Sequence, residues 1–164
     1  MSADLPGTRI VRRPARHQMQ TVTADICVLG AGIAGVSAAL EAARLGRTVV
    51  LVDAAPALGG QAVGSIIGTI IGLYTHGPAP YQLTHGIADD LIRDLTAEGS
   101  LHRRHSTTGT VTFHYDEVRL ARWIERQVDA AGIQAIVGAL LVDAAFTRRR
   151  VRHLDLATRF GGLR

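Results

Sequence analysis

The stretch "DICVLGAGIAGVSAALEAARLGRTVVLVD", residues 25–53, decides the fold of this chain. Its run from Ile26 to Leu40 contains fifteen residues, of which only Ser37 is conventionally polar. A membrane-spanning helix needs ~20 apolar residues, and Glu41 and Arg44 interrupt this run too early. A membrane helix is therefore disfavoured, and the three glycines within the run favour a turn inside a globular domain.

The same stretch has the order strand, glycine turn, helix, glycine, strand. Residues 26–29 form a short continuous apolar run, which is typical of a strand buried on both faces in a parallel sheet. A helix is expected over residues 33–45, with Gly46 at its C-terminal cap. A second apolar strand covers residues 48–52 and is closed by Asp53. This order predicts a βαβ unit with a right-handed crossover, and hence an α/β, Rossmann-like FAD/NAD(P)-binding fold with a parallel sheet.

The glycines fit the pattern G-x-G-x-x-G, and each has a physical role at its position. Gly30 permits the tight turn out of the strand, Gly32 leaves the backbone open to a pyrophosphate, and Gly35 lets the helix pack close to the sheet. The phosphate charge would lie at the helix N-terminus, where free N–H groups and the helix dipole favour an anion. We therefore expect a dinucleotide at Gly30, Ala31, Gly32, Ile33, Ala34 and Gly35.

Asp53 lies eighteen residues beyond Gly35, at the end of the second predicted strand. A carboxylate there can accept hydrogen bonds from the ribose hydroxyls of the adenosine, and it disfavours a 2′-phosphate. NADP is therefore the less favoured ligand. A coincidental glycine-rich turn in another α/β protein is the alternative interpretation.

The longer segment "DICVLGAGIAGVSAALEAARLGRTVVLVDAAPALGGQAVGS" resembles the N-terminus of FAD-dependent oxidoreductases of the glutathione-reductase structural class. Within that class it is most similar to the broad "FAD dependent oxidoreductase" family. The resemblance implies that FAD is the cofactor and that a glycine pair after the acid approaches it. It adds Ala54, Gly59, Gly60 and Gln61 to the expected cofactor-binding residues and leaves the catalytic residues unknown.

Members of that family are usually several hundred residues long, with a later Gly-Asp strand and a separate substrate domain. The 164 residues contain no such strand, so we expect the fold to be incomplete at the C-terminus. Three functions stay open: the FAD-binding portion of an oxidoreductase acting on an unknown small molecule, a non-catalytic fragment or subunit that needs a partner chain to complete the flavin site, and an NAD-binding module.

The rest of the chain is expected to form one domain over residues 23–164, after a flexible arm over residues 1–22. Residues 54–82 are rich in glycine and are predicted to form a mobile or ligand-wrapping segment, with one short helical stretch. Further predictions run along the chain: a helix over residues 83–97, a connection over 100–113, a helix over 116–131, strands on either side of Gly138, and a half-exposed strand over 151–160.

The composition of the chain excludes several classes of binding partner. The net charge is +4, but the 18 basic residues are all Arg and are scattered without interleaved aromatics, so no nucleic-acid partner is expected. Cys27 is expected to be a small buried residue. The seven His residues have no zinc-site spacing, so no metal is expected. No apolar run follows the first positive charges, which predicts a cytoplasmic protein.

Overall fold

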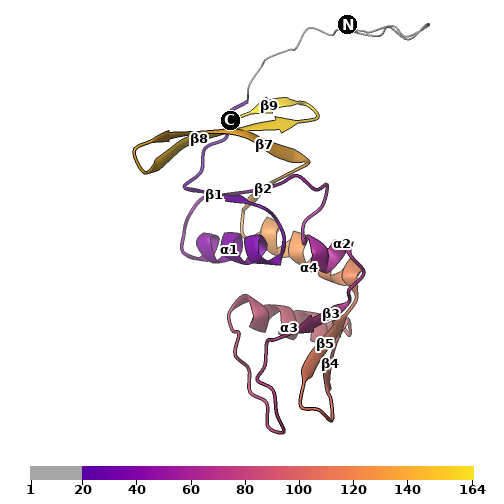
Figure 1. Ribbon diagram of the computed structural model, residues 1–164. Helices are drawn as coiled ribbons and strands as arrows, with labels where there is room; N and C mark the ends of the chain where they lie inside the picture. Colours follow the sequence, from indigo (N-terminus) through magenta and orange to yellow (C-terminus); the bar gives the residue numbers. More distant parts are fainter. Residues whose placement is uncertain (1–19) are drawn as a thin grey trace, which may run out of the picture.

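The computed structural model describes residues 20–164, in which a central sheet lies between a second sheet and a helical layer, and a third sheet with α3 lies beyond the helices (Figure 1). Its central sheet has the strand order β1-β2-β6, from β1 (Ile26–Leu29), β2 (Val49–Asp53) and β6 (Gln134–Val137). All its strand pairs are parallel, and α1 (Ile33–Arg44) joins β1 to β2. The predicted α/β fold with a parallel sheet and the helix after the glycine turn are confirmed.

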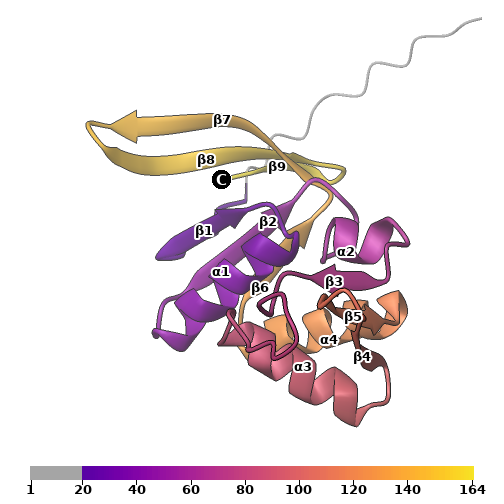
Figure 2. The ribbon, with the colours of Figure 1, turned by 60° about the horizontal axis from the view of Figure 1, so that its bottom comes forward.

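Helices cover one face of this sheet and a second sheet covers the other. The helical layer contains α1 and α4 (Glu117–Ala130). The opposite layer is antiparallel, with the order β7 (Ala139–Thr147), β8 (Arg150–Thr158) and β9 (Gly161–Leu163), and its β7–β8 hairpin extends beyond the body (Figure 2). The strands on either side of Gly138 and the strand beyond residue 150 are therefore confirmed.

Strand β2 is the centre of both cores because its side chains alternate between the two layers. Val49 and Leu51 join the large core beneath the helices. Val50 and Val52 join a smaller core with residues of β7, β8 and β9. This alternation follows from the period of two in a strand, and it explains why β2 reads as a continuous apolar run.

Strand β1 differs from the prediction. Within the described residues it lies at the edge of the sheet and pairs only with β2, and its side chains are not buried on both faces. Ile26 is 36% exposed and Leu29 is 47% exposed. Cys27 is exposed as well, which corrects its predicted burial. The apolar run predicted the strand correctly. It gave no information on whether another strand pairs with the outer edge of β1, and none does within residues 20–164.

The segment between β2 and α4 forms a small antiparallel sheet with its own helix (Figure 2). It contains α2 (Gln61–Gly64), β3 (Thr69–Ile71), α3 (Ile87–Ala97), β4 (Leu101–His105) and β5 (Val111–Tyr115), and the strand order is β3-β5-β4.

Two predictions in this segment were wrong. The connection expected over residues 100–113 is largely the β4–β5 hairpin, because alternate side chains of β5 are buried. The helix expected from residue 83 begins at Ile87, after Gly86 at φ +77°. The side chain of Asp89 accepts the Gly86 N–H at 2.9 Å and fixes that start.

The N-terminal end of the described chain runs beside β9. The Val22 N–H donates to the Arg164 carbonyl at 2.7 Å, and the Arg164 N–H donates to the Gln20 carbonyl at 2.8 Å. Residues 20–22, which the sequence assigned to the flexible arm, are thus hydrogen-bonded to the end of the chain. The rest of that arm, residues 1–19, lies outside the described residues.

The helices are short or amphipathic, and within residues 20–164 no helix combines the length and the apolar character that crossing a membrane requires.

In α4, Asp116 caps the N-terminus by accepting the Arg119 N–H at 2.9 Å. Leu120, Ile124 and Val128 then follow at helical spacing and are buried. The predicted helix over residues 116–131 is confirmed.

Trp123 connects α4 to α3 through one partly buried hydrogen bond. Its side chain is 2% exposed, and its indole N–H donates to Asp94 Oδ2 at 2.9 Å. This bond is the main cause that holds the pKa of Asp94 below its ordinary value. Because the folded-state pKa is lowered, the contribution to stability is present above about pH 4 and is lost as the pH falls through that lowered pKa.

We expect Trp123→Phe to raise the pKa of Asp94 and to lower the free energy of unfolding by at least about 1 kcal/mol at pH 7, because the carboxylate loses its donor. The difference in the free energy of unfolding between the variant and the wild type should become smaller at a pH where Asp94 is protonated. NMR titration and urea unfolding measure both quantities. Arg93→Gln, which removes an exposed ion pair to Asp94, should have the smaller effect; an equal effect would contradict the assignment.

Candidate functional site

The turn between β1 and α1 places a short loop at the carboxyl end of the parallel sheet. Gly30 has φ of +100°, a backbone conformation that favours glycine. Its N–H donates to the Val52 carbonyl at 2.7 Å, so the turn begins anchored to β2. The carboxyl ends of parallel strands are where ligands bind in open α/β sheets.

Gly35 fixes how closely α1 approaches β1. A Cβ atom at this position would lie 1.7 Å from the Gly30 carbonyl oxygen and 3.4 Å from Val28 Cγ1. Because the nearest atom belongs to the backbone, it could not move away without displacing the turn. The position therefore requires glycine for packing alone.

Gly32 is a glycine for which packing gives no reason. A Cβ there would meet no atom within 4 Å, and φ of −67° with ψ of 176° is open to any residue. Gly32 is the N-cap of α1, which has no side-chain cap and no acidic residue in its first turn. The open space therefore lies at a helix N-terminus, where backbone N–H groups and the dipole favour an anion.

The glycine pair Gly59-Gly60 packs on the turn from the opposite side. Gly32 and Gly59 form a parallel bridge, and the Gly59 N–H donates to the Ala31 carbonyl at 2.7 Å. A Cβ at Gly60 would lie 2.9 Å from Gly32 Cα. The pair thus holds the start of α2 directly against the turn between β1 and α1, and α2 begins with Gln61 at its first position.

Asp53 connects the turn to the loop that follows β2. Its Oδ2 accepts the Ala31 N–H, and its Oδ1 accepts the Ala55 N–H at 2.7 Å. A carboxylate has about four acceptor positions, so two bonds leave capacity for ribose hydroxyls. The carboxylate therefore holds the shape of the turn and remains able to accept further hydrogen bonds.

The other predicted residues take different places around the turn. Ala31 is fully buried, so its N–H rather than its side chain faces the site. Ile33 and Ala34, in the first turn of α1, are exposed, as are Ala54 and Gln61. All eleven predicted residues therefore gather at the carboxyl ends of β1 and β2, in two loops and the starts of α1 and α2.

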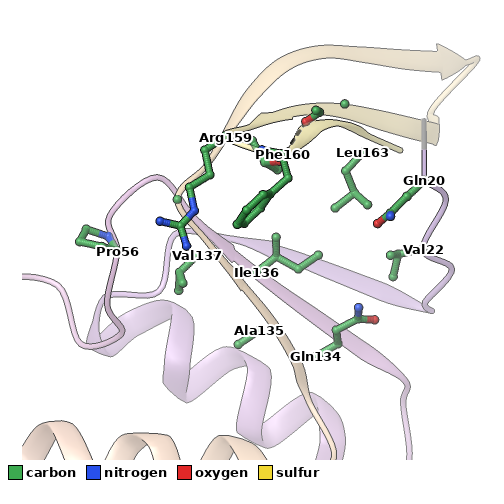
Figure 3. Close-up of a pocket in the computed structure, with 14 residues that line it drawn as sticks. Gln20, Val22, Pro56, Gln134, Ala135, Ile136, Val137, Arg159, Phe160 and Leu163 are labelled. Atoms are coloured by element: carbon green, nitrogen blue, oxygen red, sulfur yellow. Dashed lines mark hydrogen bonds between the residues drawn. The ribbon is translucent and has the colours of Figure 1, made fainter. Parts of the chain in front are cut away.

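A cavity of about 600 Å³ runs along β6, between this strand and β9, and reaches the loop after β2 at Pro56 (Figure 3). Val137 is the register partner of Asp53 across β2 and β6, and the Gly138 N–H donates to the Ala55 carbonyl at 2.9 Å. Figure 3 shows Phe160 pointing toward β6 and the Arg159 guanidinium lying near Val137. The sequence did not indicate Arg159 or Phe160, because they reach the cavity only when the chain folds back through β7 and β8.

Two residues near α2 have positions that the sequence did not indicate. Ile66 has φ of +53°, which is rare for a β-branched residue, and it is 89% exposed. Tyr115 ties α2 to β5, because its hydroxyl donates to the Ala62 carbonyl at 2.7 Å. Burial is the main cause that raises the pKa of this hydroxyl above its ordinary value. Tyr115 thus holds α2 against β5.

Several solved structures have a similar fold. The chain resembles THI4 from Thermovibrio ammonificans with TM-score 0.54 and 18% identity, over 81% of this chain and 47% of that one. It resembles p-nitrophenol 4-monooxygenase PnpA from Pseudomonas putida with TM-score 0.56 and 12% identity, over 88% of this chain and 39% of that one. It also resembles L-proline dehydrogenase from P. horikoshii with TM-score 0.53 and 12% identity, over 89% of this chain and 21% of that one.

At these identities the likeness shows the fold alone, and the chain spans less than half the length of each of these structures. No match was found among curated proteins. Residues 25–164 match the family described as "FAD dependent oxidoreductase", whose cofactor is FAD. Since that match covers most of the 164 residues, the chain belongs to the FAD dependent oxidoreductase family.

Proposed function

We propose that this chain holds the ADP half of FAD at Gly30–Gly35 and is the nucleotide-binding part of a flavin-dependent oxidoreductase whose substrate is unknown. The observation that carries the proposal is the open space at Gly32. A Cβ there would touch nothing, although the N-terminus of α1 directly behind it has no capping side chain. A pyrophosphate supplies the negative charge and the acceptor oxygens that this helix end favours.

Asp53 supports a ligand with free ribose hydroxyls. Its two oxygens already accept two backbone N–H groups, and their remaining lone pairs can accept hydroxyl groups. The same charge would repel a 2′-phosphate. The site therefore favours FAD over NADP, and family membership favours FAD over NAD.

The cavity along β6 is a suitable place for the adenine. It borders Pro56 and Val137, close to the ribose acid, and it is also lined by Arg159 and Phe160, whose guanidinium and ring stack with Cζ 4.6 Å from the ring centroid. Flat apolar and guanidinium surfaces stack on base rings. In this arrangement the flavin ring extends in the other direction, past Gly60 toward Gln61 and α2.

Bound FAD would supply the redox chemistry, by accepting two electrons and a proton as a hydride. The part of this chain is to bind and orient the dinucleotide through backbone N–H groups and the Asp53 carboxylate. We assign no catalytic residue, and the cytoplasmic location stays a prediction.

Polypeptide outside these 164 residues, from a longer form of the chain or from a partner chain, would complete the flavin site. Strand β1 has an unpaired outer edge in the described residues, and Ile26 and Leu29 are partly exposed beside it. A cavity of about 650 Å³ lies between this sheet and β8, lined by Cys27, Val50 and Leu156, among other residues. Doubly wound sheets continue beyond their first strand, so a further parallel strand fits this edge.

Titration of the purified chain with FAD, NAD⁺ and NADP⁺ tests the proposed function. FAD should bind most tightly, with quenched flavin fluorescence, and Gly32→Val should weaken FAD at least tenfold, which is about 1.4 kcal/mol. Stability should change by only about 1 kcal/mol, because the added side chain meets open space. Preferential NAD⁺ binding would favour an NAD module, and no binding at all would favour a non-catalytic fragment.

Two variants control this experiment. Ala38→Val places the same side chain at an exposed position of α1 outside the turn, so it should leave FAD affinity unchanged. Gly35→Ala places its Cβ against the Gly30 carbonyl, so it should lower the free energy of unfolding by about 1–3 kcal/mol. If Gly32→Val lowers the free energy of unfolding as much as Gly35→Ala does, Gly32 serves packing and the phosphate assignment fails.

The open edge of β1 has its own test in amide hydrogen exchange. The Ile26 and Gly30 N–H groups donate to β2 residues or to Thr48 beside it, so the alternate amides of Cys27 and Leu29 lie on the outer edge. They should exchange much faster than Ile26 and Val28 in the monomeric chain, as read by NMR. Equal protection of all four amides would mean that the edge is already covered.

A further inference from the structure

The small sheet β3-β5-β4 has one face on the core and one in solvent. In β5, Val111, Phe113 and Tyr115 are buried, whereas Thr112 is half-buried and His114 is exposed. Because side chains alternate along a strand, His114 and Thr112 belong to the outer face. Their partners on β4 belong to the same face.

Two histidines lie directly opposite one another on this outer face. The register of β4 and β5 pairs His102 with His114, and both side chains are exposed. Directly opposed residues of an antiparallel pair have Cβ atoms about 5 Å apart. Two imidazoles at that spacing can donate one nitrogen each to a single metal ion, because each ring reaches beyond its Cβ.

Two hydroxyl groups stand beside the ring of His114. Thr69, its register partner on β3, places Oγ1 3.4 Å from His114 Nδ1. Thr112 places Oγ1 3.4 Å from His114 Nε2. Both ring nitrogens of His114 therefore face hydroxyl groups, so a metal shared with His102 requires this exposed ring to rotate toward β4. A hydroxyl that keeps its hydrogen bond to the other nitrogen would then fix the tautomer and orientation of the metal-bound imidazole.

We propose that His102 and His114 form a surface site for one divalent transition-metal ion of the class that prefers imidazole: Cu²⁺, Ni²⁺ or Zn²⁺. Water would complete the coordination, since no group of three or more His, Cys, Asp or Glu with metal-site geometry occurs within the described residues. Cu²⁺ binds most tightly to such a donor set by the general order of divalent affinities. The site is separate from the dinucleotide turn and does not depend on the proposed function.

Arg104 is the charged group that shares this face with the histidines. It lies two residues from His102 on β4 and is paired with Thr112. A guanidinium is always charged, so it opposes a nearby cation, and its removal should tighten metal binding. This sign is specific to a cation site: removal of Arg104 from an anion site would weaken binding.

Cu²⁺ titration of the purified chain tests the site, with calorimetry for affinity and electron paramagnetic resonance for the donor atoms. The wild type should bind one Cu²⁺ with nitrogen donors. Loss of an outer partner alone typically weakens a metal site ~10–100-fold, so His102→Gln and His114→Gln should each weaken Cu²⁺ at least ~10-fold. Arg104→Gln should strengthen it. These exposed substitutions should leave the unfolding temperature without metal unchanged.

His76→Gln is the matched control, because His76 is an exposed loop residue outside the sheet. It should keep the wild-type Cu²⁺ affinity. Added Cu²⁺ should also raise the unfolding temperature of the wild type, as any ligand of the folded state does, and both pair variants should lose that shift. The proposal is overturned if either single variant binds Cu²⁺ like the wild type, or if His76→Gln weakens binding as much as they do.

Discussion

The contact between Gly35 and the Gly30 carbonyl is the constraint on which the site depends. With no side chain at residue 35, α1 begins immediately against the end of β1. That closeness brings the N-terminus of α1 to the carboxyl edge of the sheet, where β2 delivers Asp53. A methyl group at Gly35 would separate helix and strand, and the N-terminus of α1 would move away from the loop that Asp53 holds. Packing and ligand binding thus use neighbouring glycines for different purposes.

The electrostatics of the site depend on two groups, the N-terminus of α1 and the Asp53 carboxylate. The first turn of α1 has no acidic side chain, so its positive end is not neutralised from within. Asp53 is the acid beside it, and its carboxylate is held by the N–H groups of Ala31 and Ala55. The anion-attracting helix end and the hydroxyl-accepting acid therefore stand on opposite sides of one loop. This separation matches a ligand with a charged pyrophosphate and an uncharged ribose.

The sequence predicted the βαβ unit and its glycines because both depend on local rules. A glycine turn, a helix with a Gly cap and two apolar strands are all readable within residues 25–53. Features that depend on distant pairing were not readable. The exposure of β1 follows from which strands lie beside it, and the hairpin over residues 101–115 was obscured by basic side chains on its outer face. The His102–His114 pair likewise exists only through strand register, since twelve residues separate the two in sequence.

The central claim is that the pyrophosphate of FAD lies at the N-terminus of α1, and backbone amide shifts measured during an FAD titration test it most directly. The account predicts that the largest shifts occur at Gly32, Ile33 and Ala34, that ADP alone reproduces them, and that α3 is unaffected. Shifts that avoid residues 30–35, or that appear with the flavin half alone and not with ADP, would contradict the account.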